Sequence, residues 1–431
     1  MYDAICIGGG LNYTSAIVLA KAGIKVALIE KDLNHIGGTC LNEGCIPSKN
    51  LLHRAKALFE TKEECFEGEK KLNLAKLQEI ITSSIQASRK GITAQIKASG
   101  VDLIEGEAKV IDENQVKVNE KILEAKYIII GTGSRPRIPE GIEIDYKNII
   151  TSNEAIKLTK FPKEIAIYGS GAIGLEFASF FAINGVKTTL IFRHENLSRK
   201  FPESIDKKIQ SLLKANAVNL MPNTSIKSAK TQNNKVIIKT NNGEIKVEKL
   251  LVATGRIPNT DVIETDKIKV SKGIEVNEYF QTSVPNVFAI GDCNGKLQLA
   301  HAARAEALNV ADFILGKKER LNLNNIPKFI YTIPLSYAFI GVRSENKATF
   351  PIKYLGIRDA IPYAKSGEIT LYANDEGFII GADIFSPYAE EIVGIVATAI
   401  ESEIDIKTFK KVTFPHPTFS ESIDRALRRF K

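Results

Sequence analysis

The apolar and polar positions at the start of the chain follow the pattern of a strand, a glycine-rich turn, a helix and a second strand. Apolar residues over Tyr2–Ile7 predict a buried strand, and Gly8–Gly10 predicts a tight turn after it. A helical apolar pattern then runs as far as Gly23, and Val26–Ile29 predicts a second strand. Glu30 ends that strand, where a carboxylate can accept hydrogen bonds from ribose hydroxyls while the helix N-terminus meets a pyrophosphate. The segment therefore predicts a dinucleotide-binding unit.

This first unit departs from the usual glycine fingerprint at Tyr13, which stands where the third glycine is expected. That glycine normally allows the helix to pack closely on the strand, so a tyrosine there should push the two apart. We expect a shortened turn in which Thr14, Ser15 or Ala16 makes the close contact.

The same pattern recurs in the middle of the chain with its glycines intact. The strand Ile165–Tyr168 leads into Gly169, Gly171 and Gly174, and an apolar helix follows as far as Gly185. We expect these glycines to position a second dinucleotide.

The second strand of this repeat ends in cations instead of the usual ribose-binding acid. Thr188–Ile191 is followed by Arg193 and His194, with Arg199 slightly beyond. Hydrogen bonds to charged groups are worth about 1.5–3 kcal/mol each, so two or three of them are enough to select NADPH through its 2′-phosphate. The alternative is a solvated basic loop. We favour NADPH over NADH.

Two cysteines five residues apart lie within the glycine-bracketed segment Gly37–Lys49. A regular α-helix would place their Cα atoms about 7.5 Å apart, whereas a disulfide needs about 4.4–6.8 Å. If Cys40 and Cys45 pair, the backbone must leave ideal helix, and Gly44 gives it the freedom to do so. Pro47 suits the first turn of a helix, so we expect Cys45 near a helix N-terminus, where a thiolate is stabilised. A reversible redox pair suits this pattern better than two buried thiols or a zinc site, which would need a second Cys/His pair.

Read as a string, Gly37–Lys49 resembles the redox-active disulfide of the flavoprotein disulfide reductases. The closest form is that of dihydrolipoamide dehydrogenase, with glutathione reductase and mercuric reductase as relatives. Ile130–Pro136 and Val287–Asp292 resemble two later FAD-domain motifs of this family, and Leu299–His301 is again similar to dihydrolipoamide dehydrogenase. The Arg-His-x5-Arg spacing from Arg193 resembles the NADPH subsite of glutathione reductase. The resemblance implies FAD and a nicotinamide as cofactors, and we expect no metal.

The resemblance also implies roles for individual residues. Cys45 would lie against the flavin, while Cys40 would exchange with the substrate as a mixed disulfide. Lys49 and Glu176 match a buried ion pair beside the flavin ring, with a purely structural salt bridge as the alternative. The expected FAD-binding residues are Gly8, Gly10, Glu30, Lys31, Thr39, Lys49, Ala108, Gly133, Asp292 and Ala300. The expected nicotinamide-binding residues are Gly169, Gly171, Gly174, Glu176, Arg193, His194, Arg199 and Gly255.

A histidine–proline motif near the end of the chain resembles the part of the family that carries the catalytic base. It implies that His416 is the acid/base, that Glu421 orients it, and that the pair reaches the disulfide of the other subunit in a homodimer. An imidazole that titrates near neutrality can exchange protons with a thiol. Thr418 and Glu421 also have the spacing of a capping box for the last helix, and both roles can hold at once.

The chain of 431 residues is too long for one ordinary core. The two glycine-turn repeats predict an α/β protein with two Rossmann-like nucleotide-binding domains, and the strand-rich segment from about Ile326 resembles the α+β C-terminal dimerisation domain of the family. In the dimerisation domain, strands are expected at Glu368–Tyr372 and Phe378–Asp383, and a helix at Ala389–Glu401. The expected boundaries are 1–145 for the first part of the FAD-binding domain, 146–255 for the NAD(P)H-binding domain, 256–325 for the second part of the FAD-binding and central domain, and 326–431 for the dimerisation domain.

Composition and charge narrow the setting. Hydrophobic residues make up 44% of the chain and charged residues 25%, as in globular proteins. The formal net charge of +8 comes from lysines and arginines scattered along the chain, so nucleic acid is not an expected partner. The first strand leaves no room for a signal peptide, and no apolar run is long enough for a membrane span. We therefore expect a cytoplasmic protein without a membrane partner, in which a disulfide serves catalysis better than structure.

The resemblance, together with the chemistry of the cysteine pair, implies a flavoprotein that moves electrons between NAD(P)H and a small or protein-bound dithiol/disulfide, in cell redox homeostasis, most like dihydrolipoamide dehydrogenase. The cysteine segment points to lipoamide, whereas the cationic cluster points to an NADPH-dependent glutathione-type or other low-molecular-weight disulfide reductase. A non-catalytic flavoprotein subunit of a larger complex is the alternative from another class, with Tyr13 as its best support. An NADPH oxidase or quinone reductase is a further option.

Overall fold

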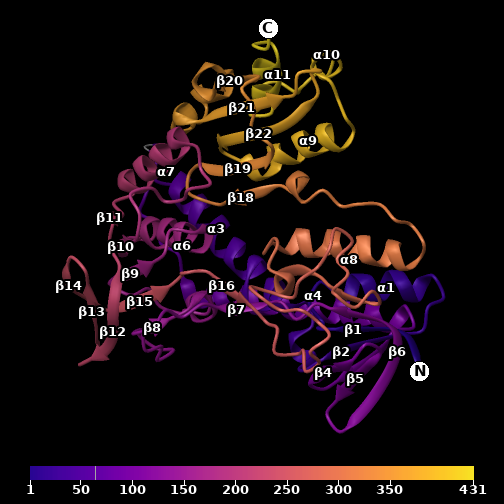
Figure 1. Cartoon of the computed structure of the whole chain (residues 1–431). Helices are drawn as coiled ribbons and strands as arrows, with labels where there is room; N and C mark the ends of the chain where they lie inside the picture. The colour runs from indigo at the N-terminus through magenta and orange to yellow at the C-terminus, as the bar shows by residue number, and fades with distance from the viewer. Residues whose placement is uncertain (64) are drawn as a thin grey trace.

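The computed structural model describes residues 1–63 and 65–431, which form three units that meet at one helix, α3 (Cys45–Glu60) (Figure 1). In the first unit, a sheet has the strand order β3-β2-β1-β6-β5-β4, and β17 pairs in parallel with the end of β6. The strands are β1 Tyr2–Ile7, β2 Val26–Glu30, β3 Asp102–Glu105, β4 Ala108–Asp112, β5 Gln115–Val118, β6 Lys121–Ile130 and β17 Val287–Ala289. This unit therefore joins the start of the chain to a strand far downstream.

Helices cover this sheet and carry the cysteine segment. They are α1 Tyr13–Lys21, α2 Gly38–Glu43, α3, α4 Leu74–Ala98 and α8 Ala300–Ile314. Along α4, Leu77, Ile81 and Ile85 recur at helical spacing and are buried against the core that also contains α3. The Asn73 side chain caps α4 by accepting the Lys76 N–H at 3.0 Å.

The second unit is a parallel sheet of order β11-β10-β9-β15-β8. Its strands are β8 Ile149–Ile150, β9 Glu164–Tyr168, β10 Lys187–Ile191, β11 Asn219–Met221 and β15 Lys249–Val252, and its helices are α5 Ser152–Ala155, α6 Ala172–Ile183 and α7 Glu203–Ala215. A separate antiparallel sheet contains β12 Ile226–Gln232, β13 Lys235–Thr240 and β14 Gly243–Val247. A ribbon of β7 Ser134–Pro136 and β16 Arg256–Pro258 links this unit to the first.

The third unit is an antiparallel sheet of order β18-β19-β22-β21-β20, drawn in orange and yellow at the top of Figure 1. Its elements are β18 Lys328–Ile330, β19 Ser336–Gly341, β20 Lys347–Pro351, β21 Glu368–Ala373, β22 Ile379–Ser386, α9 Ala389–Glu401, α10 Ile406–Phe409 and α11 Glu421–Leu427. The predicted strands and the predicted helix in this region are confirmed within a few residues. No helix in the described part of the chain is both long and apolar enough to cross a membrane.

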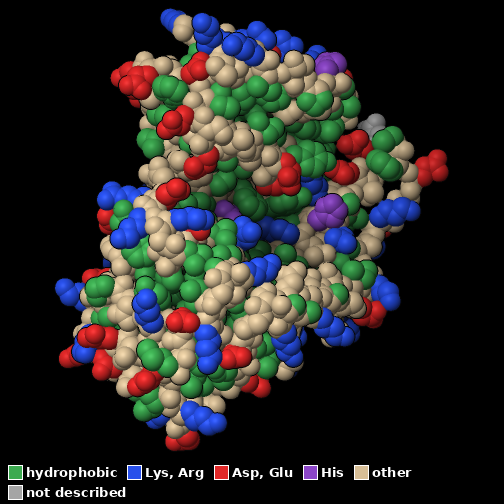
Figure 2. All heavy atoms as spheres, turned by 90° about the vertical axis from the view of Figure 1, so that its right-hand side faces the viewer, with side chains coloured by type: hydrophobic (Ala, Val, Ile, Leu, Met, Phe, Trp, Pro, Cys, Tyr) green, Lys and Arg blue, Asp and Glu red, His purple; other side chains and the backbone are tan. Residues whose placement is uncertain are grey.

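The fold class is as predicted: two nucleotide-binding α/β sheets and an α+β unit. Seen from the right-hand side of Figure 1, a hollow lies between the upper and lower parts of the molecule, with hydrophobic side chains in and above it and cationic side chains nearby (Figure 2). Such a hydrophobic hollow is typical of a ligand-binding groove or of a surface that another protein covers.

Candidate active site

The cysteine segment is a helix interrupted at one residue. α2 ends at Glu43, Gly44 leaves helical geometry, and α3 begins at Cys45. A Cβ on Gly44 would lie 2.8 Å from the carbonyl oxygen of Thr39. A side chain at position 44 would therefore clash with the backbone and disturb the break between α2 and α3. The break brings the free thiols of Cys40 and Cys45 close enough for each to affect the ionisation of the other. The predicted departure from helix at Gly44 is therefore confirmed, and so is the helix start at Cys45.

The two thiols are electrostatically different. The hydrogen bond from Cys40 lowers the pKa of Cys45 to about 7, and the nearby Lys49 ammonium contributes to the decrease. The same hydrogen bond raises the pKa of Cys40, and burial raises it further. Cys45 is therefore the first of the pair to become a thiolate near neutral pH, and that thiolate is the reactive form.

Lys49 is held by a helix of the second unit. Its Nζ donates to both Glu176 oxygens at 2.7 Å, and Glu176 also accepts the backbone N–H of Tyr331 at 3.1 Å. The structure thus brings Cys45, Lys49 and Glu176 together from α3 and α6, with Tyr331 just beyond β18. A charged pair at this junction fixes the ammonium beside the Cys45 sulfur.

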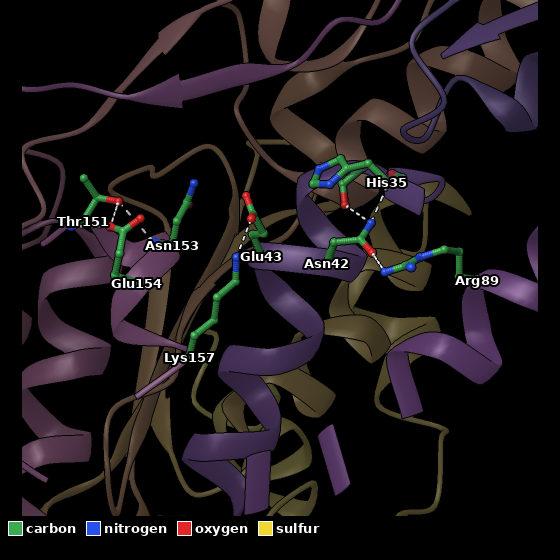
Figure 3. Close-up of polar contacts among 9 residues, drawn as sticks. His35, Asn42, Glu43, Arg89, Thr151, Asn153, Glu154 and Lys157 are labelled. Carbon is green, nitrogen blue, oxygen red and sulfur yellow. Dashed lines mark hydrogen bonds and ion pairs between the residues drawn. The ribbon is translucent and has the colours of Figure 1, made fainter. Parts of the chain in front are cut away.

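On the other side of the redox segment, polar contacts anchor the residues between the two cysteines (Figure 3). Asn42 Nδ2 donates to the carbonyls of His35, Ile36 and Gly38 at 2.9–3.1 Å, and its Oδ1 accepts from Arg89 at 2.6 Å. These contacts line one side of a cavity of about 290 Å³. Since Asn42 ties the segment to the preceding loop and to α4, it keeps the cysteines in register. Sequence reasoning missed it, because a single amide carries no motif.

Glu43 makes the matching contact at the other end of this cavity. Its carboxylate pairs with Lys157 Nζ at 2.7 Å, which links the redox segment to the residues that follow α5 (Figure 3). The Lys157 side chain is largely exposed, so the ion pair adds little to the stability of the fold and serves mainly to position the Glu43 end of the redox segment.

In the first glycine turn, Thr14, Ser15 and Ala16 are all buried, and Ala16 lies in one core cluster with Ala4 and Cys6 of β1. Asn12 makes a further close contact that the sequence did not indicate: its Nδ2 donates to the carbonyls of Ile7 at 3.2 Å and Ile129 at 2.9 Å. A Cβ on Gly131 would lie 2.8 Å from the Asn12 Cβ, so helix and sheet meet there. Tyr13 is only half-buried and begins α1, so it does not separate the helix from the strand. A short polar residue replaces the missing glycine because its amide satisfies two strand-end carbonyls.

The rest of this turn fits a dinucleotide. Glu30 Oε2 accepts the Gly9 N–H at 2.6 Å, which fixes the carboxylate at the end of β2. A Cβ on Gly8 would lie 2.4 Å from the Gly131 carbonyl oxygen, whereas one on Gly133 would meet nothing within 4 Å. The chain is therefore packed tightly under the turn at Gly8, whereas the space beside Gly133, between β6 and β7, is open. Of the remaining expected residues, Lys31 directly follows β2, Thr39 precedes Cys40 within α2, and Ala108 begins β4 at the edge of the sheet.

Asp292 lies in a polar cluster that joins the first and second units. It accepts a hydrogen bond from Ser134, whose Oγ also accepts Arg256 Nε at 2.7 Å. Burial raises the pKa of Asp292, with Ser134 and Arg256 opposing the shift. Ala300 is the first residue of α8, where backbone N–H groups have no partner within the helix. Ser134 and Arg256 were missed by sequence reasoning, although Arg256 directly follows Gly255.

The second glycine turn also fits a dinucleotide. A Cβ on Gly174 would lie 1.8 Å from the Gly169 carbonyl oxygen, whereas one on Gly171 would meet nothing within 4 Å. Arg193, His194 and Arg199 are all exposed on the loop between β10 and α7. Two arginines and a histidine, all exposed beside an open glycine turn, are typical of a site that binds an anion.

The histidine pair forms in the third unit. His416 Nδ1 lies 3.0 Å from Glu421 Oε2, and the other Glu421 oxygen accepts the Thr418 N–H at 2.8 Å. The predicted capping box does not form: α11 begins at Glu421 with Ser420 as its N-cap, and the Thr418 hydroxyl donates to the Pro415 carbonyl. The His416 side chain is 72% exposed, and no hydrogen bond in the described part of the chain joins it to Cys40 or Cys45.

Comparisons with known proteins agree with this geometry. A family model described as pyridine nucleotide-disulphide oxidoreductase matches residues 2–307, and the dimerisation-domain model of that family matches residues 326–427. Dihydrolipoyl dehydrogenase 2, chloroplastic, of Arabidopsis thaliana is 32% identical and covers 100% of this chain and 82% of its own. Dihydrolipoyl dehydrogenase of Mycoplasma genitalium is also 32% identical, over 98% of this chain and 97% of its own.

Solved structures give the same picture. The HOCl-induced flavoprotein disulfide reductase RclA from Escherichia coli, as its Cu(II) complex, is 25% identical with a TM-score of 0.89, and covers 100% of this chain and 99% of its own. LpdA from Mycobacterium tuberculosis, at 23% identity and a TM-score of 0.91 over 99% of each chain, supports the fold. The chain belongs to the pyridine nucleotide-disulphide oxidoreductase family, and it is an FAD-dependent oxidoreductase that transfers electrons between a nicotinamide and a disulfide.

Proposed function

We propose that this enzyme is a homodimer that prefers NADPH and acts on a small disulfide or dithiol of the lipoamide type. The contact between Cys40 and Cys45, beside the Lys49–Glu176 pair, carries the proposal. Relatives named dihydrolipoyl dehydrogenase over almost the whole chain support the lipoamide-type substrate.

FAD, when bound, supplies two-electron transfer between the nicotinamide and the cysteine pair. The residues present fit it: Gly8, Gly10, Glu30, Lys31, Thr39 and Ala108 for its ADP half, and Gly133, Asp292, Ala300 and Lys49 for the rest. The open side of Gly133 and the fixed Glu30 carboxylate support this assignment. Gly169, Gly171, Gly174, Glu176 and Gly255 would bind the nicotinamide cofactor.

The cysteines would exchange with substrate in two steps. The Cys40 thiolate attacks one sulfur of the substrate disulfide, which forms a mixed disulfide and expels one substrate thiolate. The Cys45 thiolate then attacks the Cys40 sulfur, which forms the Cys40–Cys45 disulfide and expels the second thiolate. Two electrons from NADPH, with one solvent proton, restore the two cysteine thiols as NADP⁺ is released. The net reaction consumes one NADPH and one proton for each disulfide reduced to two thiols.

Cys40 needs a base, because its hydrogen bond to Cys45 raises its pKa. We assign this role to His416 of the partner subunit, which would take the Cys40 proton and return it to the departing thiolate. Glu421 holds the imidazole through Nδ1, so Nε2 is left to face the sulfur. The exposed position of the histidine in the third unit supports a role across the dimer.

Steady-state kinetics test the proposal. We expect NADPH to give a higher kcat/KM than NADH, with lipoamide preferred to glutathione disulfide and to other small bis-thiol disulfides. Arg199→Ala should lower kcat/KM for NADPH by about ten- to hundredfold and leave NADH almost unchanged, since one charged hydrogen bond is lost. Comparable efficiencies for the two cofactors in the unmodified enzyme would contradict the roles of Arg193, His194 and Arg199.

A second candidate is an NADPH-dependent reductase of another low-molecular-weight disulfide, favoured by the exposed cationic loop after β10. Glutathione disulfide is the weaker choice, because α1 carries no arginine to bind its carboxylates. The same screen separates the candidates by their kcat/KM ratios.

A further inference from the structure

An arginine of the third unit holds the backbone beside the proposed NADPH-selecting side chain. Arg343 Nη1 donates to the carbonyl of Lys200 at 3.2 Å, and Lys200 directly follows Arg199. The bond therefore joins the third unit to the loop between β10 and α7.

Arg343 is itself fixed by a buried carboxylate. Asp383, which is 3% exposed, accepts Arg343 Nε at 2.7 Å and Nη2 at 2.8 Å, so the pair is bidentate. Asp383 also accepts hydrogen bonds from the hydroxyls of Tyr337 and Tyr372. Because the guanidinium is planar and Asp383 binds its Nε and Nη2, the direction of Nη1 is fixed. A lysine side chain could not make all of these contacts.

The loop is also held on the other side of Arg199. Ser170, within the second glycine turn, donates its hydroxyl to the Leu197 carbonyl at 2.7 Å. Phe201 packs edge-on against the buried Tyr337 ring, with the centroids 5.2 Å apart. Arg199 thus lies between an anchor to the glycine turn and an anchor to the third unit, while its own side chain is exposed.

We infer that Arg343 and Asp383 act as positioning residues that fix the loop carrying Arg199 for a 2′-phosphate, so that the third unit takes part in nicotinamide selection. The inference rests on the proposed NADPH preference. An exposed arginine on an unanchored loop would lose conformational entropy on binding, which lowers its contribution to affinity.

The test compares KM values for NADPH and NADH, together with inhibition by 2′,5′-ADP. Arg343→Lys keeps the charge and an ion pair with Asp383 but lacks the fork that reaches Lys200. We expect KM for NADPH and the inhibition constant of 2′,5′-ADP to rise about three- to tenfold, the range of one net hydrogen bond, with KM for NADH and kcat unchanged.

Two further variants separate this role from other effects. Asp383→Asn removes a negative charge, so simple electrostatics would tighten NADPH binding, whereas release of Arg343 should weaken it. Lys208→Met is the matched control, because it breaks a different bridge between the second and third units, Lys208–Glu368 at 2.7 Å, and should leave the cofactor ratio unchanged.

The outcomes are distinct. An unmodified enzyme that does not prefer NADPH overturns the proposed cofactor and this inference together. A preference that survives both Arg343→Lys and Asp383→Asn overturns the inference alone, as does an equal loss in Lys208→Met.

Discussion

Lys49 Nζ lies 2.7 Å from both carboxylate oxygens of Glu176, although 127 positions of sequence separate the two residues. The pair connects the redox helix of the first unit with α6 of the second. Each partner acts on Cys45 with opposite sign: Lys49 lowers its pKa and Glu176 raises it. The Lys49–Glu176 ion pair therefore links the first and second units and also adjusts the pKa of Cys45.

This opposition predicts two opposite titration shifts. In the reduced protein the Cys45 thiolate should appear with a midpoint near pH 7, since its pKa is lowered to about 7. Lys49→Met should move the midpoint to higher pH, and Glu176→Gln should move it to lower pH. Thiolate absorbance against pH measures the shift, with Cys45→Ser as the control. A midpoint that stays fixed in both variants would remove the electrostatic role of the pair.

Loss of Cys40 should separate disulfide chemistry from other electron transfer. Cys40→Ser should abolish turnover with lipoamide, because no mixed disulfide can form. Reduction of a quinone or of oxygen by NADPH should persist, since these acceptors need no thiol. If the disulfide activity of Cys40→Ser matched that of the unmodified enzyme, the exchange step proposed for Cys40 would be wrong.

Loss of His416 should lower disulfide turnover by about 10²- to 10⁴-fold, the usual contribution of a general acid/base. Mixed dimers of His416→Ala and Cys40→Ser subunits give the sharper test. If the histidine acts across the dimer, each mixed dimer contains one complete site, and a random mixture should recover about a quarter of full activity. If the two residues act within one subunit, the mixture stays inactive.

Lys56 is buried at 4% exposure, and its Nζ has no hydrogen-bond partner in the described residues. Burial lowers the pKa of Lys56. Its Nζ lies 3.7 Å from the centroid of the Tyr388 ring, and this cation–π contact offsets part of the free-energy cost of burying the charge. A depressed lysine pKa means that the unfolded chain binds more protons, so stability rises with pH between the folded and unfolded pKa values. Lys56→Met should raise stability by on the order of 1 kcal/mol and flatten this dependence, as measured by thermal unfolding at several pH values. Unchanged or lower stability would show that the contact with Tyr388 outweighs desolvation.

The spacing of residues in the sequence predicts those parts of the site in which the backbone conformation of a turn or of an element's end restricts the residue type. Gly44 was predicted to break a helix, because two cysteines five residues apart cannot meet on a regular one. Glu30 and Gly174 were predicted at strand and helix ends, where hydrogen-bonding geometry restricts residue type. The roles predicted for individual cofactor-binding residues stay predictions.

Long-range contacts escaped the sequence. Asn12 replaces a glycine by donating to two strand ends, one of them 117 positions away, and Arg343 reaches Lys200 across 143 positions. These contacts depend on how the units pack against one another, and that packing cannot be predicted from the periodicity of the sequence. In the homodimer that we propose, the position of His416 relative to the cysteines depends in addition on the second subunit.

The strand β17 has a consequence for how the protein is made. The first sheet is completed only when Val287–Ala289 pairs with β6, and Asp292 and α8 follow it directly. The ribosome delivers the N-terminal strands first, yet the proposed flavin site stays incomplete until Asp292, about two thirds of the 431 residues, has been synthesised. If FAD binds at this site, a nascent chain can complete its binding residues only after β17 and Asp292 have been synthesised.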